Sequence, residues 1–193
     1  MPKYFDLKVS LLDIAPRIWR RFLLRSTATF FHLHKAIQVA SGWEDYHLFA
    51  FLKTRGKYKI IAAVDPKAYS LDPERVEGPP AGEVPLSSHF KRKGSKCIYL
   101  YDFSDYWQHM VELKHSVKLS EDFQRRLLGG ARAFPPEDCG GLGGYQYSLT
   151  ALKPINPEVD EESRTYLTQH RHWLGDWHPE AFDFEAAKES FDR

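Results

Sequence analysis

Residues 4–25, YFDLKVSLLDIAPRIWRRFLLR, carry the pattern that decides the fold. Apolar and polar side chains alternate over residues 4–13, which predicts a half-buried strand because successive strand residues point to opposite faces. Pro16 predicts a turn, and residues 17–25 predict a second strand that completes a hairpin. Only short connections join the early strands, so the sheet should be largely antiparallel.

Four further strands are expected from runs of alternating or β-forming residues, at 47–53, 57–64, 97–103 and 110–119. Strands come first along the chain and helices come later, an order typical of an α+β fold. The sequence therefore predicts a largely antiparallel sheet of five or six strands. One helix lies between the early strands, and two or three C-terminal helices should pack on the sheet.

The early helix is expected at about residues 30–41, with Thr27 or Thr29 as its N-cap and Gly42 just past its end. Acidic residues in the run 158–162 predict a helix N-terminus, where the helix dipole favours negative charge. The C-terminal helices are expected at roughly 143–152, 158–172 and 179–191, the last with Pro179 in its first turn or, alternatively, with Asp183 as its N-cap.

Composition excludes several classes of protein. The chain has 193 residues, of which 42% are hydrophobic, and its net charge is +1. An intrinsically disordered chain is excluded, and a protein that coats nucleic acid through bulk positive potential is disfavoured. Two cysteines are too few for a disulfide scaffold. The sequence has no apolar run that approaches a membrane span and no signal-peptide block at its start, so we expect a cytoplasmic protein without membrane contact.

Residues 65–96 interrupt the regular pattern. Five of the twelve prolines and several glycines lie in this segment. Long unpatterned loops are uncommon inside compact domains. Neither flank looks complete alone, so the segment is interpreted as an insertion loop in one domain that spans residues 1–193.

The stretch YDFSDYWQH, residues 101–109, places two carboxylates and an imidazole between two strands. Asp102, Asp105 and His109 are a plausible metal-binding or acid–base set. Their spacing matches no established ligand pattern. In the alternative interpretation the aspartates cap a tight turn while Trp107 packs on the sheet.

The stretch PPEDCGG, residues 135–141, presents two acids and a thiol on a loop before a helix. Glu137 and Asp138 would repel a phosphate, and the glycines match no phosphate-binding motif. Asp138 has an alternative role as a turn or cap residue. Cys139 would need a base partner and a lowered pKa to act as a nucleophile, and the sequence shows neither.

The end of the early helix offers further candidates. His32 and His34 are two residues apart on a helix, so both cannot face one ion. Trp43 and His47 could line a pocket at the helix end. A tryptophan after a helix-stopping glycine is, in the alternative interpretation, a plug in the core.

Two other groups of residues mix basic or aromatic side chains. Arg17, Arg21 and Arg25 share one face of the second strand with Trp19, as on sheets that bind nucleic acid. More often, arginines on a hairpin point into solvent or form ion pairs with acidic side chains rather than bind nucleic acid. The aromatic and histidine residues near the C-terminus are interpreted as a helix end that packs on the body; they are His170, His172, Trp173, Trp177 and His178.

Several of these motifs occur in the same order in one known family. The chain resembles the Ri-plasmid open-reading-frame-three-like family, also described as insertion-element passenger TnpR-like proteins. The motifs are Leu33, His34, Ile37 and Gln38; Gly42, Trp43, His47 and Leu48; Tyr101 to His109; Pro135 to Gly141 with Tyr145; and Pro179 to Asp183. Ser104 stands where the family has glycine. The resemblance implies an α+β fold and no established activity, and the resolvase-like label lacks the expected catalytic pattern in this chain.

We therefore expect a ligand- or peptide-binding module with an acidic and aromatic pocket. The candidate pocket residues are Trp43, His47, Asp102, Asp105, Trp107, His109, Glu137 and Asp138. One alternative is a metal-dependent hydrolase that uses the same acids and histidine. A second is a mobile-element accessory protein that contacts nucleic acid through Arg17, Arg21 and Arg25. The residues indicate a small ligand or a peptide as partner and identify no cofactor.

Overall fold

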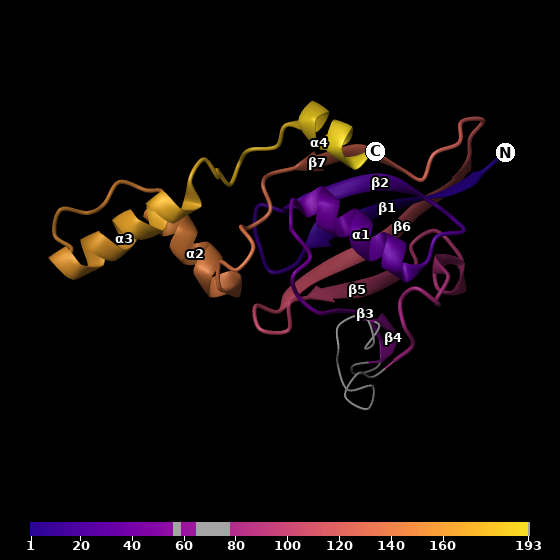
Figure 1. Cartoon of the computed structure of the whole chain (residues 1–193), viewed down its shortest axis with the longest axis horizontal. Helices are drawn as coiled ribbons and strands as arrows, with labels where there is room; N and C mark the ends of the chain where they lie inside the picture. The colour runs from indigo at the N-terminus through magenta and orange to yellow at the C-terminus, as the bar shows by residue number, and fades with distance from the viewer. Residues whose placement is uncertain (56–58, 65–77, 193) are drawn as a thin grey trace.

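The structure is a computed structural model that describes residues 1–55, 59–64 and 78–192. Within these residues, seven strands form one sheet in the order β4-β3-β5-β6-β1-β2-β7, and every neighbouring pair is antiparallel (Figure 1). The strands are β1 (Lys3–Leu11), β2 (Trp19–Arg25), β3 (Phe49–Lys53), β4 (Ile60–Ala63), β5 (Lys96–Tyr101), β6 (Trp107–Lys118) and β7 (Arg125–Ala131). The α+β class and the antiparallel sheet are confirmed.

The number of strands differs from the expected five or six because β7 was not predicted. Its sequence, RRLLGGA, contains two glycines and few β-forming side chains. A Cβ atom at Gly130 would lie 2.6 Å from the ring of Phe182 and 2.7 Å from the side chain of Arg20. A side chain at position 130 would therefore displace Phe182 or Arg20, and this part of β7 depends on contacts with distant residues.

One face of the sheet carries the core. Alternate residues of β1, beginning with Phe5 and Leu7, are buried in one hydrophobic cluster with Phe22 of β2. Helix α1 (Phe30–Ser41) lies across this face and buries Phe30 and Leu33 there (Figure 1). Helix α4 (Phe184–Phe191) contacts β7 and α1.

The ends of α1 follow from its sequence. Thr29 is the N-cap, and its backbone N–H donates to Nδ1 of His32, the residue three positions later. Gly42 adopts a left-handed conformation with φ of 75° directly after the helix. Val84 and Ala81 supply carbonyls to the first two helical N–H groups, at 3.0 Å each.

The segment expected as an insertion loop is only partly described. Residues 65–77 lie outside the described residues, whereas residues 78–95 contribute to the core. Ala81, Leu86 and Phe90 are buried, and η2 (Leu86–Ser88) is a short 3-10 helix. Their irregular spacing gave no periodic signal in the sequence.

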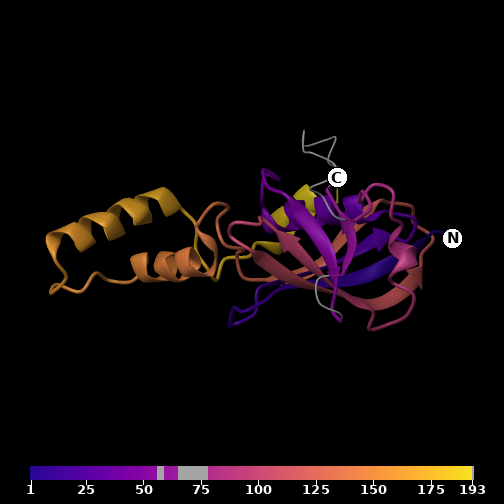
Figure 2. The ribbon, with the colours of Figure 1, turned by 90° about the horizontal axis from the view of Figure 1, so that it is seen from below.

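The C-terminal helices only partly match the expectation that they pack on the sheet. Helices α2 (Gly141–Ala151) and α3 (Glu161–Leu174) pair with each other and project beyond one end of the sheet (Figures 1 and 2). The last helix begins later than residue 179, because Asp183 is its N-cap and accepts from the backbone N–H of Ala186. Among the described helices, none combines the length and apolar character needed to cross a bilayer.

Candidate functional site

Three connecting segments meet at the end of the sheet from which α2 and α3 project. They are residues 42–48 before β3, residues 102–106 between β5 and β6, and residues 132–140 before α2. Direct hydrogen bonds join them: the backbone N–H of Glu44 donates to Oε2 of Glu137 at 2.6 Å, and that of Gly140 donates to Oδ2 of Asp105 at 3.0 Å. Motifs far apart in the sequence thus converge here.

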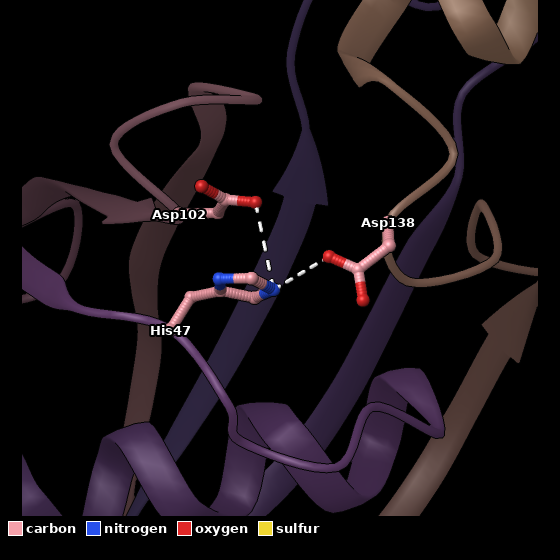
Figure 3. A group of neighbouring side chains, drawn as sticks. All are labelled: His47, Asp102 and Asp138. Carbon is pink, nitrogen blue, oxygen red and sulfur yellow. Dashed lines mark hydrogen bonds and ion pairs between the residues drawn. The ribbon is translucent and has the colours of Figure 1, made fainter.

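His47, Asp102 and Asp138 form a cluster at this junction (Figure 3). Nε2 of His47 lies 2.7 Å from Oδ1 of Asp138 and 3.7 Å from Oδ2 of Asp102. One ligand atom from each residue lies within 4.8 Å of the other two. Asp102 is buried, His47 is partly buried and Asp138 is exposed, so the cluster opens to solvent on one side.

The turn after β5 fixes the orientation of Asp102. Oδ1 of Asp102 accepts hydrogen bonds from the backbone N–H groups of Ser104 at 2.8 Å and Asp105 at 3.2 Å. The other carboxylate oxygen, Oδ2, is the one that faces His47. The turn-capping role and the site role proposed for Asp102 in the sequence are therefore compatible.

Left-handed backbone conformations concentrate in these segments. Asp102, Tyr106 and Asp138 have φ angles of 56°, 59° and 60°. Such values are uncommon for residues other than glycine and are found more often at functional sites. In the β5–β6 turn, Asp102 and Tyr106 adopt the left-handed conformation and Ser104 does not. A serine at position 104, where the family has glycine, is therefore not strained.

Glu137 is anchored rather than free. Its Oε1 accepts a short hydrogen bond from the Tyr101 hydroxyl, and its Oε2 accepts from the backbone of Glu44. Burial and this bond to Glu137 raise the pKa of Tyr101, so the phenol stays protonated. The loop that carries Asp138 is therefore held to both the end of β5 and the segment after α1.

Trp43, Trp107 and His109 do not line the cluster, because the structure places them in the core. Strand β6 begins at Trp107, so Trp107 and His109 share the helix-covered face with Val111. The ring of Trp43 stacks on Tyr101 with a centroid separation of 5.0 Å, as expected for a core plug. Burial lowers the pKa of His109 to about 4, which leaves its imidazole neutral at pH 7.

Other aromatic residues, absent from the candidate residues, belong to the same segments as His47 and Asp102. Tyr46 precedes His47, Phe103 follows Asp102, and Tyr106 belongs to the same turn. They are exposed by 66%, 51% and 47% respectively. Apolar patterning does not separate exposed aromatic residues from buried ones, so adjacency to the acids was the only available signal.

A second histidine–carboxylate contact is buried beneath this region. Nε2 of His34 lies 2.8 Å from Oδ1 of Asp45, and its Nδ1 lies 2.7 Å from the Tyr99 hydroxyl. Gln38 donates to the same hydroxyl at 2.9 Å. His34 is fully buried, and burial lowers its pKa. This group is part of the core, while His32 is exposed, as two helical residues so spaced should be.

The arginines considered for nucleic acid are largely engaged within the chain. Arg21 makes two hydrogen bonds to Asp6, at 2.8 and 2.7 Å. Arg25 forms an ion pair with Asp122. Arg17 lies in the connection between β1 and β2 rather than in the strand.

Cys139 is unsuited to nucleophilic chemistry. Its side chain is buried, and burial together with Asp105 raises its pKa to about 12. The thiol is therefore protonated at neutral pH and is a weak nucleophile.

The fold and site define an α+β protein with a seven-stranded antiparallel sheet and a cluster of one histidine and two aspartates at its end. The chain belongs to the plasmid pRiA4b ORF-3-like family, whose sequence model matches residues 3–186. It is 30% identical over 187 residues to the uncharacterized protein y4hQ of Sinorhizobium fredii (strain NBRC 101917 / NGR234), covering 96% of this chain and 85% of that protein.

A solved structure is also similar over nearly the whole chain. It is the crystal structure of the protein of unknown function MM3350 from Methanosarcina mazei Go1, with a TM-score of 0.74 and 33% sequence identity. The match covers 96% of this chain and 98% of that one. These comparisons confirm the family and the fold, and their descriptions name no activity or ligand.

Proposed function

We propose that the protein is a ligand-binding module that holds a divalent metal ion through His47, Asp102 and Asp138. The proposal rests on the observation that one ligand atom from each residue lies within 4.8 Å of the others. Ligands about 2.1 Å from a common ion are separated from each other by roughly 3–3.5 Å, so small side-chain movements suffice to form the site. One imidazole and two carboxylates suit Zn²⁺ or Mn²⁺.

Charge supports a cation at this position. Glu44, Asp105 and Glu137 accompany the two aspartate ligands in the same three segments. Carboxylates brought together repel one another, and a divalent ion would offset much of that repulsion. A phosphate-bearing ligand would meet this excess of acids unfavourably, so a neutral or cationic ligand fits the site better.

The rim of the site supports binding of an organic ligand. Tyr46, Phe103 and Tyr106 are exposed and belong to the same segments as His47 and Asp102. Aromatic side chains supply large apolar contact area, and a metal with only three protein ligands keeps positions open for a ligand or water. In this proposal the site keeps the acidic and aromatic character expected from the sequence, with these rings in place of Trp43 and Trp107.

A metal-dependent hydrolase is a second candidate, favoured by the same open coordination positions. A bound Zn²⁺ lowers the pKa of its water to about 7 and would generate a hydroxide nucleophile. Asp105, on the same turn as Asp102, is a candidate base, although one of its oxygens already accepts from Gly140. Hydrolysis of generic ester substrates by metal-loaded protein, lost in Asp105→Asn with metal binding retained, would distinguish this enzyme from a binding module.

Calorimetric titration of metal-free protein with Zn²⁺ and Mn²⁺ tests the site. We expect one equivalent to bind, and Asp102→Asn and Asp138→Asn each to weaken binding at least tenfold. Asp102→Asn is suitable because its remaining Oδ1 can still cap the turn. Glu158→Gln, which removes an exposed carboxylate from the α2–α3 connection, is the matched control and should bind as the wild type does. Equal binding by all four proteins, or no binding by the wild type, would exclude the metal site.

A further inference from the structure

The helical pair α2–α3 carries a pocket of its own, distinct from the cluster at the sheet end. Its volume is about 300 Å³, and its lining residues are Tyr147, Tyr166, Gln169, His170 and Trp173. Tyr147 comes from α2 and the others from α3, where spacings of three and four residues place them on one face. His170 and Trp173 were expected from the sequence to pack on the body, but Trp173 is 50% exposed.

The rings are arranged around His170. Its ring centroid lies 4.8 Å from that of Tyr147, with an interplanar angle of 64°, and 5.2 Å from that of Trp173. Tyr147 and Tyr166 are exposed as well as Trp173. Four aromatic rings thus line one pocket, three of them exposed, and an aromatic cage that binds an ammonium group has a lining of the same composition.

A hydrogen bond fixes the position of the His170 ring. Ser148 donates its hydroxyl proton to the carbonyl of Gly144 at 2.9 Å, so Nε2 of His170, also 2.9 Å away, donates to the Ser148 oxygen. Burial lowers the pKa of His170. A neutral imidazole does not repel a cation, and this hydrogen bond fixes the ring within the pocket.

The pocket rings differ from other aromatic side chains of this protein in having no cation over them. Lys8 lies 4.5 Å from the ring of Trp19, and Arg126 lies 3.9 Å from that of Phe123. In the described part of the chain, no lysine or arginine stacks on the rings of the pocket. Arg171, on the same helix, instead donates to the carbonyls of Ala151 and Lys153.

We propose that this pocket binds a quaternary or methylated ammonium group. The negative faces of aromatic rings attract cations, and quaternary ammonium groups lose little hydration when they enter such a cage. The lining residues include no carboxylate, whereas a primary ammonium or guanidinium has N–H donors that require strong acceptors. A choline-like small molecule and a trimethyllysine side chain of a partner protein share this chemistry.

A titration followed by amide chemical shifts tests the proposal with choline and its neutral isostere 3,3-dimethylbutan-1-ol. We expect saturable shifts at the α2–α3 residues with choline and roughly tenfold weaker binding of the neutral alcohol. Trp173→Leu, which keeps an apolar side chain, should abolish choline binding. Phe31→Leu, which removes an exposed ring from α1, is the matched control and should bind normally. Helical content by circular dichroism verifies that each variant folds.

A trimethyllysine peptide, compared with its unmodified lysine form, separates the two sources. Tighter binding of the methylated peptide than of choline would identify a protein partner, and the reverse would identify a small molecule. Equal affinity for choline and the neutral alcohol would overturn the proposal, because the pocket would then be only apolar. The absence of saturable shifts with both choline and the methylated peptide would also overturn it.

Discussion

The guanidinium carbon of Arg20 lies 4.0 Å from the ring centroid of Phe182, in the interior where the C-terminal segment closes over the sheet. Arg20 is buried, and its partners are backbone carbonyls: Nε donates to Ala40 at the end of α1, and Nη1 donates to Ala131 at the end of β7. Burial lowers the pKa of Arg20 to about 10, so it remains charged at neutral pH. One side chain thereby links β2, α1, β7 and the Phe182 segment.

Replacing Arg20 should therefore destabilise the whole fold. Arg20→Met keeps much of the apolar stem but leaves the carbonyls of Ala40 and Ala131 without their donor. We expect the free energy of unfolding to fall by roughly 2–4 kcal/mol in a urea titration. Arg17→Met, in the β1–β2 connection, should change it by less than about 0.5 kcal/mol. Similar losses in both variants would show that the buried hydrogen bonds are not the cause.

Two adjacent glycines of α2 should respond in opposite directions to the same substitution. A Cβ atom at Gly144 would lie 1.5 Å from the carbonyl oxygen of Cys139, whereas one at Gly143 would meet nothing within 4 Å. Gly144→Ala should therefore lower the free energy of unfolding by at least about 3 kcal/mol, because backbone must move. Gly143→Ala should raise it by about 0.5–1 kcal/mol, since alanine favours the helix. Thermal unfolding of the pair checks the contrast, and equal changes would contradict the tight contact with Cys139.

Stability should depend on the pH through His109. Its pKa is about 4 in the folded protein and 6.5 when exposed, so the unfolded chain binds more protons between these values. The folded state therefore has its full stability with respect to His109 above pH 6.5. The free energy of unfolding then decreases as the pH falls toward 4, because the unfolded chain takes up the proton first. A difference of about 2.5 pKa units corresponds to about 3 kcal/mol.

A non-titrating variant isolates this effect. His109→Phe places a ring of similar size among Phe134 and Trp43, so the unfolding free energy measured between pH 7 and pH 4 should decline less steeply than that of the wild type. His172→Gln changes an exposed histidine and should leave the slope unchanged. If His109→Phe retained the full wild-type slope, carboxylates elsewhere would account for the acid sensitivity.

Local signals explain the parts of the fold that were predictable. The strand at β1 and the left-handed Gly42 after α1 are predicted by neighbouring residues, and the structure has both. The alternation predicted a half-buried strand, which is wrong: β1 lies inside the sheet between β6 and β2, and Tyr4, Asp6 and Ser10 are buried on its other face. Strand β7 and the projection of α2–α3 depend on contacts between distant segments, such as Gly130 with Phe182. The pattern of residues within a short stretch of sequence does not predict such contacts.

The candidate site was likewise only partly predictable from local sequence. His47, Asp102 and Asp138 were all among the candidate residues, but the sequence did not show which of the eight candidates meet. Trp107 and His109 were assigned to a turn because β6 was expected to begin at residue 110. Extending the alternation of Val111 backwards by two and four residues would have placed both side chains on the core face.

Metal binding should be visible as a gain in thermal stability that depends on Asp138. The proposed ligands are more than thirty residues apart along the chain, so an ion bound only by the folded chain would oppose their separation on unfolding. At a free metal concentration 100-fold above Kd, the gain is about 2.7 kcal/mol. For a chain of this length we expect the unfolding temperature to rise by roughly 5–10 °C with Zn²⁺ or Mn²⁺, and chelation to reverse the rise.

The same variant separates the metal effect from the ion pair between His47 and Asp138. The side chain of Asp138 is 61% exposed, so this pair alone should contribute less than about 1 kcal/mol. Metal-free Asp138→Asn should therefore unfold close to the temperature of the metal-free wild type, yet gain little when metal is added. Glu158→Gln should gain as much as the wild type. A gain of equal size in Asp138→Asn would place the ion elsewhere, whereas a large loss of stability without metal would show that Asp138 acts through the fold rather than as a ligand.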